Sequence, residues 1–121
     1  MRYMLLIYNN PATLEALSEE EKSAVFGDVD AIMTELRESG ELVGGEALAH
    51  PSTAKTVRRE SGAVAATDGP FAEAKEQFAG YLAVDCETEE RALEIALRWP
   101  DPKHGGAIEV RAVMQQSGTE M

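Results

Sequence analysis

The sequence predicts an α+β fold of the ferredoxin-like type, a split β-α-β arrangement with an extra hairpin. Two observations support this fold. Apolar residues alternate as in strands over residues 2–8, 77–85 and 107–113, and they recur at helical spacing over residues 18–39 and 88–99. A short strand and a hairpin lie between the first helix and the second long strand, and this order of elements is that of a split β-α-β unit.

The first long helix has clear signals at both ends. Ser18 and Glu21 have the capping-box spacing, in which each side chain accepts the other residue's free backbone N–H. Gly40 follows Ser39 and can take the left-handed conformation that ends a helix. The inner stripe is expected to contain Val25, Val29, Ile32 and Leu36, with Phe26 and Met33 beside it.

Between the two helices we expect a short strand at residues 41–45 and a hairpin of residues 54–59 and 63–67. Gly44 and Gly45 mark a bulge or a close backbone approach in the short strand. Glu60, Ser61 and Gly62 form the hairpin turn.

The second helix is expected to begin after Thr88 as N-cap and to end at Trp99, because Pro100 cannot continue it. Its predicted inner stripe is Ala92, Leu93, Ala96 and Leu97.

The first strand is apolar on both faces, which predicts self-association. Right-handed crossovers place both helices on one face of the sheet and leave the other face bare. Because an exposed apolar sheet face favours association, we expect a homodimer, a dimeric α+β barrel with a cavity between its two sheets. The side chains expected to face that cavity are Tyr8, Tyr81, Glu109 and Arg111.

Length and composition exclude several classes of protein. The 121 residues fit one domain, expected over 1–114, with a polar tail at 115–121. A net charge of −11 argues against nucleic acid and anionic membrane surfaces as partners. The single cysteine, Cys86, excludes a disulfide framework within the chain and is expected to fill space at a strand end. No apolar run approaches the roughly 20 residues of a membrane span, and we expect a cytoplasmic protein.

The segment Asp68-Gly69-Pro70-Phe71 is the least ordinary stretch of the chain. With residues 40–46, 78–84 and 108–111, it resembles the DGPF branch of the YCII-related proteins over residues 2–114. The resemblance implies a dimeric α+β barrel. Some relatives are encoded beside extracytoplasmic-function sigma factors, which implies an accessory role. Classical members have a His on the first helix that meets an Asp after the second strand. Residues 18–39 contain no His, so this dyad cannot be carried over.

The motif and its surroundings supply the candidate site residues. The catalytic candidates are Asp68, as hydrogen-bond acceptor or general base, and His50, as a secondary proton carrier. The candidate ligand-binding residues are Lys75, Glu73, Phe71, Tyr8 and Arg111.

Each candidate also has a structural interpretation. The Asp68 carboxylate can fix its own turn, and the charged run that follows can be solvated. Phe71 can anchor a core, and Arg111 can pair with Glu109. His104, like His50, lies in a loop where exposure is the usual state.

Two classes of function follow. No nucleotide-binding glycine pattern and no metal-ligand spacing occurs, so we expect no cofactor and no metal. The first class binds a small organic molecule between the sheets, with acid–base chemistry. The second is an accessory module that binds a protein partner, such as a sigma factor, through the seven acids and two bases of residues 18–39. An enclosed cavity with Asp68 or Lys75 on its wall favours the first class, and a filled interior with salt-sensitive binding to a partner favours the second.

Overall fold

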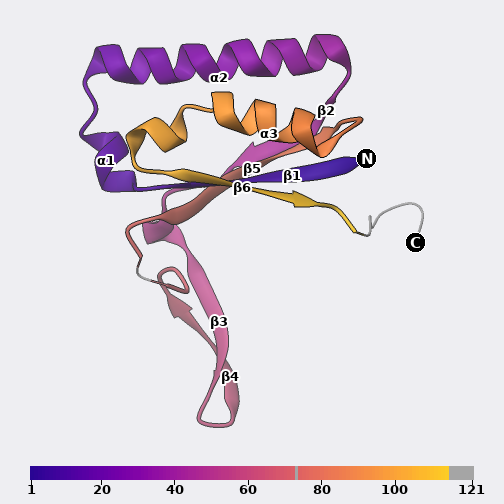
Figure 1. Cartoon of the computed structure of the whole chain (residues 1–121). Coiled ribbons are helices and arrows are strands. Elements are labelled where there is room, and N and C mark those ends of the chain that lie inside the picture. The colour runs from indigo at the N-terminus through magenta and orange to yellow at the C-terminus, as the bar shows by residue number, and fades with distance from the viewer. Residues whose placement is uncertain (73, 115–121) are drawn as a thin grey trace.

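The computed structural model describes residues 1–72 and 74–114 and shows two helices layered over one face of a sheet (Figure 1). Its elements are, in chain order, β1 (Arg2–Asn9), α1 (Pro11–Glu15), α2 (Glu19–Ser39), β2 (Leu42–Ala47), the 3-10 helix η1 (Pro51–Thr53), β3 (Lys55–Glu60), β4 (Ala63–Asp68), β5 (Gln77–Asp85), α3 (Glu89–Arg98), the 3-10 helix η2 (Asp101–His104) and β6 (Ala107–Ala112).

The sheet confirms the predicted fold class. Its four strands lie in the order β2-β5-β1-β6, and every neighbouring pair is antiparallel. The first and third strands of the split β-α-β unit, β1 and β5, therefore occupy the centre of the sheet. β3 and β4 form a separate two-stranded hairpin.

The helix ends follow the sequence signals. The Glu21 N–H donates to the Ser18 hydroxyl at 3.1 Å, and the Ser18 N–H donates to the Glu21 carboxylate at 3.0 Å, which confirms the capping box. Gly40 ends α2 with φ of 80°. Thr88 caps α3 by accepting from the Arg91 N–H.

The core lies between the sheet and the two long helices. Its buried apolar residues are Tyr3, Leu5, Ile32, Leu36, Leu82, Val84, Cys86, Ala92, Ile95, Ala96 and Trp99. The inner stripe of α3 is therefore Ala92, Ile95 and Ala96, and the expected positions Leu93 and Leu97 are wrong, since Leu97 is 84% exposed. With Trp99, the buried positions have the spacing i, i+3, i+4, i+7, which is as typical of a helix face as the predicted one. The spacing of apolar residues therefore did not show which of the two faces of α3 is buried.

Two local features differ from expectation. The short helix α1 was not predicted, although Asn10 caps it through its side chain and Pro11 occupies the first helical position. β2 begins one residue later than expected and continues to Ala47. The expected irregularity is present, because the pairing of β2 with β5 shifts register between Leu42 and Gly44.

The C-terminal half of α2 is held by ion pairs as well as by packing. Arg91 of α3 donates from Nε and Nη2 to the two carboxylate oxygens of Glu41, at 2.9 and 2.8 Å. Nη2 of Arg91 also donates to Glu35 of α2 at 3.0 Å. Arg98 contacts both oxygens of Glu35, at 2.8 and 3.0 Å. This network ties α2, α3 and the start of β2 together.

The second face of the sheet carries no helix, as expected. Register places Met4 opposite Arg111 and Leu6 between Glu109 and Tyr81, with side chains pointing away from the helices. We call this surface the open face. The hairpin β3–β4, which we call the arm, projects from the body on the same side (Figure 1).

Phe71, which follows the arm, is 73% exposed, so the expectation that it anchors a core is wrong for this chain. The guanidinium of Arg58 lies 5.0 Å from the centre of its ring. The segment that carries the motif therefore packs at the base of the arm and not in the interior.

The expected tail, 115–121, lies outside the described residues. No helix in the described part of the chain is long and apolar enough to cross a membrane.

Candidate functional site

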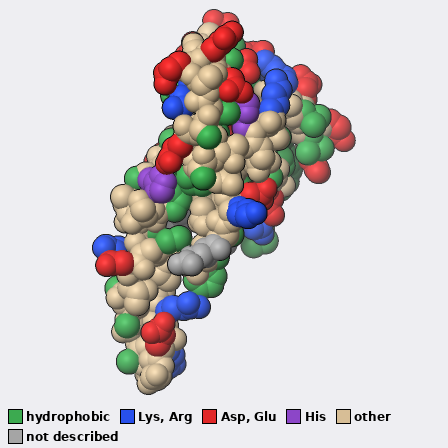
Figure 2. Space-filling view, turned by 90° about the vertical axis from the view of Figure 1, so that its left-hand side faces the viewer, with side chains coloured by type: hydrophobic (Ala, Val, Ile, Leu, Met, Phe, Trp, Pro, Cys, Tyr) green, Lys and Arg blue, Asp and Glu red, His purple; other side chains and the backbone are tan. Residues whose placement is uncertain are grey.

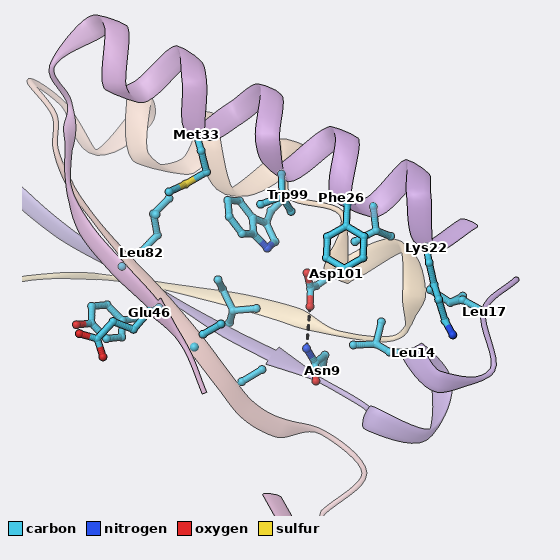
Figure 3. A pocket seen from close by; sticks show the side chains of 18 of the residues that line it. Asn9, Leu14, Leu17, Lys22, Phe26, Met33, Glu46, Leu82, Trp99 and Asp101 are labelled. Atoms are coloured by element: carbon cyan, nitrogen blue, oxygen red, sulfur yellow. Dashed lines mark hydrogen bonds between the residues drawn. The ribbon is translucent and has the colours of Figure 1, made fainter. Parts of the chain in front are cut away.

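A cavity of about 580 Å³ lies between the N-terminal half of α2 and the sheet. Its walls are mainly apolar, and the side chains from helices and loops include Leu14, Leu17, Val25, Phe26, Val29, Met33 and Trp99. Figure 3 shows Met33 and Leu82 at one end and Lys22 with Leu17 at the other. The volume and composition are typical of a site for a small organic molecule.

Asp101 is the most buried polar group of this cavity and pairs with Asn9, while Glu15, Lys22 and Glu46 also line the cavity. The Asn9 side-chain amide donates to the Asp101 carboxylate at 3.0 Å (Figure 3). Asp101 is 9% exposed and is the one buried charged side chain among the described residues. Within that part of the chain it forms no ion pair. A carboxylate in such a place favours a partner that donates hydrogen bonds.

The floor of the cavity includes two glycines on neighbouring strands, Gly45 of β2 and Gly80 of β5. A Cβ at Gly45 would lie 2.7 Å from the Tyr81 carbonyl oxygen, and one at Gly80 would collide with the Glu46 carbonyl oxygen. Close backbone approach therefore requires glycine at both positions, and it leaves this part of the floor without side chains.

A second cavity, of about 720 Å³, lies at the base of the arm. Its lining includes Tyr8 and Phe78 from the sheet, His50 and Pro51 from the loop after β2, and Phe71. The rings of Tyr8 and Phe78 lie 5.6 Å apart. Three of the predicted site residues, Tyr8, His50 and Phe71, are thus brought together here.

His50 contacts groups on both of its ring nitrogens. Nδ1 accepts from the Ser52 N–H at 3.1 Å, and Nε2 lies 3.3 Å from the Glu15 carboxylate. Because Nδ1 accepts a hydrogen bond, the neutral ring carries its proton on Nε2, directed at Glu15. Glu15 lines the cavity under α2 and His50 lines the cavity at the arm, so the pair lies between them.

The acidic residue of the motif lies outside both cavities. Asp68 ends β4, and its 88% exposed side chain pairs with Lys55 on the facing strand. Lys75 is exposed, and Glu73 lies outside the described residues. Arg111 is exposed on the open face, opposite Met4 of β1. Asp68, Lys75 and Arg111 therefore line neither of the two cavities.

Cys86 is buried directly after β5, in agreement with the expectation that it fills space. Burial raises the pKa of its thiol, and the nearby Glu41 carboxylate raises it further. Both effects disfavour the thiolate that a nucleophile needs. No group of three or more His, Cys, Asp or Glu residues within the described ranges could hold a metal ion.

Sequence reasoning missed Asn9 and Asp101. Both were interpreted only as parts of segments that end a strand or a helix. A signal was present, because Asp101 stands between Pro100 and Pro102, where the chain turns back from α3 toward the sheet.

The fold and the cavity define a ferredoxin-like α+β domain with a pocket under its long helix. Residues 1–117 match the family model of the YCII-related domain, and the chain therefore belongs to the YCII-related family. It is also similar to an uncharacterised protein of Rhizobium meliloti (strain 1021). The two are 36% identical over 96 residues, which cover 79% of this chain and 77% of that protein.

The family resemblance implies a His on the first helix and an Asp after the second strand. The long helix α2 carries no His, so this dyad is not present, and His50 after β2 instead contacts Glu15 at the end of the short helix α1.

Proposed function

We propose that this protein binds a small, mainly apolar organic molecule with a hydrogen-bond donor group in the cavity under α2. The observation that carries the proposal is the buried Asp101 carboxylate in a cavity whose walls are mainly apolar. The apolar walls favour a hydrocarbon or aromatic body, and Asp101 favours an amine or hydroxyl group at one end.

The cavity also bears on the choice between the two classes of function considered from the sequence. An accessory module would be expected to have a filled interior, whereas about 580 Å³ under α2 is free for a ligand. This observation supports the ligand-binding class. The site differs from the one expected, since it lies on the helix side of the sheet and not between two sheets, and neither Asp68 nor Lys75 lines it.

The binding proposal is tested with three probes that share one ring system: naphthylmethylamine, naphthylmethanol and naphthoic acid. Calorimetry should detect the amine and the alcohol, and the acid should bind least, because its carboxylate is repelled by Asp101. Asp101→Asn should weaken the amine about tenfold while keeping the shape of the site. Equal binding of all three probes to both proteins would contradict the role given to Asp101.

A filled cavity provides the second arm of this test. Val29→Trp places an indole in the cavity and should abolish binding of the amine. Val57→Ser, on the distant arm, is the matched control and should bind as the wild type does. Binding that survives Val29→Trp would place the probe elsewhere and refute the site.

Acid–base chemistry at His50 is the second part of the proposal. It is supported by the contact with Glu15, which orients the ring and favours a proton on Nε2. Nitrogen NMR of the ring at neutral pH should find mainly the Nε2-protonated tautomer, and Glu15→Gln should reduce its share. A ring that shows the Nδ1-protonated form would remove His50 from this role.

We further propose a homodimer through the open face. Support comes from Met4, Leu6 and Tyr8 of β1, which lie on that face without a covering helix. Within the family we assign the chain to the DGPF branch, on the motif that begins at Asp68. A cytoplasmic location is supported by the free, buried Cys86.

A further inference from the structure

The arm is a two-stranded hairpin without cover from the rest of the chain. Every residue of β4 is exposed, and Val57 and Val64 are 66% and 71% exposed. Its turn is tight, since Ser61 and Gly62 both have positive φ, of 48° and 81°. An isolated two-stranded hairpin is only marginally stable in water, so two exposed valines on it favour a partner.

The two faces of the arm differ in chemistry. Val57 pairs with Ala66 and Arg59 pairs with Val64, and directly opposed residues point to the same side. Both valines therefore lie on one face, which we call the valine face. Successive residues of a strand alternate, so Ala65 points to the opposite face, where Arg58 covers Phe71. One face is occupied by the chain itself and the other is bare.

We propose that the valine face of the arm docks on a second copy of this chain. This inference rests on the pairing through the open face proposed above. Two observations select a second copy as the occupant. The arm projects on the same side as the open face, so a copy that covers the open face also lies against the arm (Figure 1).

Charge is the second observation. Residues 54–68 contain Lys55, Arg58 and Arg59 against Glu60 and Asp68, a net charge of +1, in a chain whose net charge is −11. Figure 2 shows acidic side chains gathered over the helical body, and the arm extending from it with basic groups of its own. Opposite charges attract the arm of one copy to the body of another, whereas two bodies alone repel each other.

The open face offers partners for the basic groups of the arm. Arg59 lies on the valine face, and Glu46 and Glu109 are exposed on the open face. Docking would thus bury Val57 and Val64 and bring Arg59 toward acids of the second copy. It would also cover the cavity at the base of the arm, where His50 lies.

The test measures dimer dissociation of the full-length protein by sedimentation velocity over a concentration series. Val64→Glu places a carboxylate on the valine face and should raise the dissociation constant about tenfold or more. Ala65→Glu adds the same charge one residue away on the other face and should change it less than about twofold. Circular dichroism confirms that both variants are folded.

A third variant distinguishes docking of the valine face from dimerisation through the open face. Leu6→Glu, on the open face, should give a monomer if the sheets pair. If Leu6→Glu is monomeric and Val64→Glu dimerises as the wild type does, the docking of the arm is refuted and the pairing stands. A wild type that is monomeric at all concentrations refutes both and leaves the valine face to a different protein. If Val64→Glu weakens dimerisation and Ala65→Glu does not, the docking of the valine face is supported.

Discussion

The two halves of α2 belong to one uninterrupted helix and meet different surroundings. In the C-terminal half, Ile32 and Leu36 are buried against the sheet and Glu35 is bound by two arginines. In the N-terminal half, Phe26 is exposed, Val25 lines a cavity, and Val29 borders that cavity while packing partly against the core. A helix of 21 residues is about 31 Å long, so packing at one end holds the other end at a distance from the sheet.

This comparison shows how a small domain can keep a cavity open. The apolar side chains of the N-terminal half are too few to fill the space above Gly45 and Gly80, and the helix cannot settle onto the sheet while its other half is fixed. The cavity is therefore maintained by contacts that lie outside it. Variants in the two halves should separate stability from binding.

The largest difference in the free energy of unfolding is expected between substitutions of apolar residues in the two halves of α2. Leu36→Ala removes a fully buried side chain and should lower the free energy of unfolding by about 2–5 kcal/mol. Val29→Ala, at the cavity, should cost less than about 1 kcal/mol, because its side chain already borders empty space. Urea denaturation of both variants measures the difference. Equal losses would mean that the N-terminal half is packed as tightly as the other.

The next largest loss of stability is expected for a substitution of Arg91. Arg91→Met removes the two-point contact with Glu41 and leaves that mostly buried carboxylate without a positive charge beside it, with the Ser39 hydroxyl still donating to it, which should cost about 1–3 kcal/mol. Arg98→Met is the control, since its contact with Glu35 is more exposed and should matter less. Thermal unfolding compares the two variants. A larger loss in Arg98→Met would contradict the importance given to burial.

The sequence predicted most of this framework because its signals are local. The capping box at Ser18, the glycine at Gly40 and the prolines after Trp99 each act within a few residues, and the helices begin and end where these signals indicate. The exposure of Leu97 was not predictable, because two stripes of α3 have helical spacing and only the packing of α3 against β1 and β6 of the sheet selects one.

The site was less predictable, since it depends on distances between segments remote in sequence. Asn9 and Asp101 are 92 residues apart and meet only because β1 and the loop after α3 converge. His50 was a candidate from its loop, but its partner Glu15 lies on a helix that was not expected. The motif at Asp68 drew attention to the arm, where Asp68 itself is exposed and only the following residues, Pro70 and Phe71, line the cavity at the base of the arm.

A pH titration of stability tests the ion pairs that hold the C-terminal half of α2. Hydrogen bonds from Arg98 and then Arg91 lower the pKa of Glu35 from 4.5 to about 2. The unfolded chain takes up this proton at a higher pH than the folded chain, so the stabilisation is complete above about pH 5 and is lost as the pH falls toward about 2. Glu35→Gln should lack this dependence, and its stability should approach that of the wild type at low pH. Parallel unfolding curves of both proteins against pH would contradict the assignment.

The smallest effect on stability is expected at Phe26, where the comparison between the two halves is most direct. Its ring is exposed in the absence of ligand yet borders the cavity, so Phe26→Ser should change the free energy of unfolding by no more than about 0.5 kcal/mol. The same variant should weaken binding of naphthylmethylamine several-fold, because an aromatic wall of the site is lost. An exposed aromatic residue that serves only as surface would change neither quantity. A residue that holds the fold would change both, so the combination of intact stability and weakened binding identifies a side chain retained for a ligand.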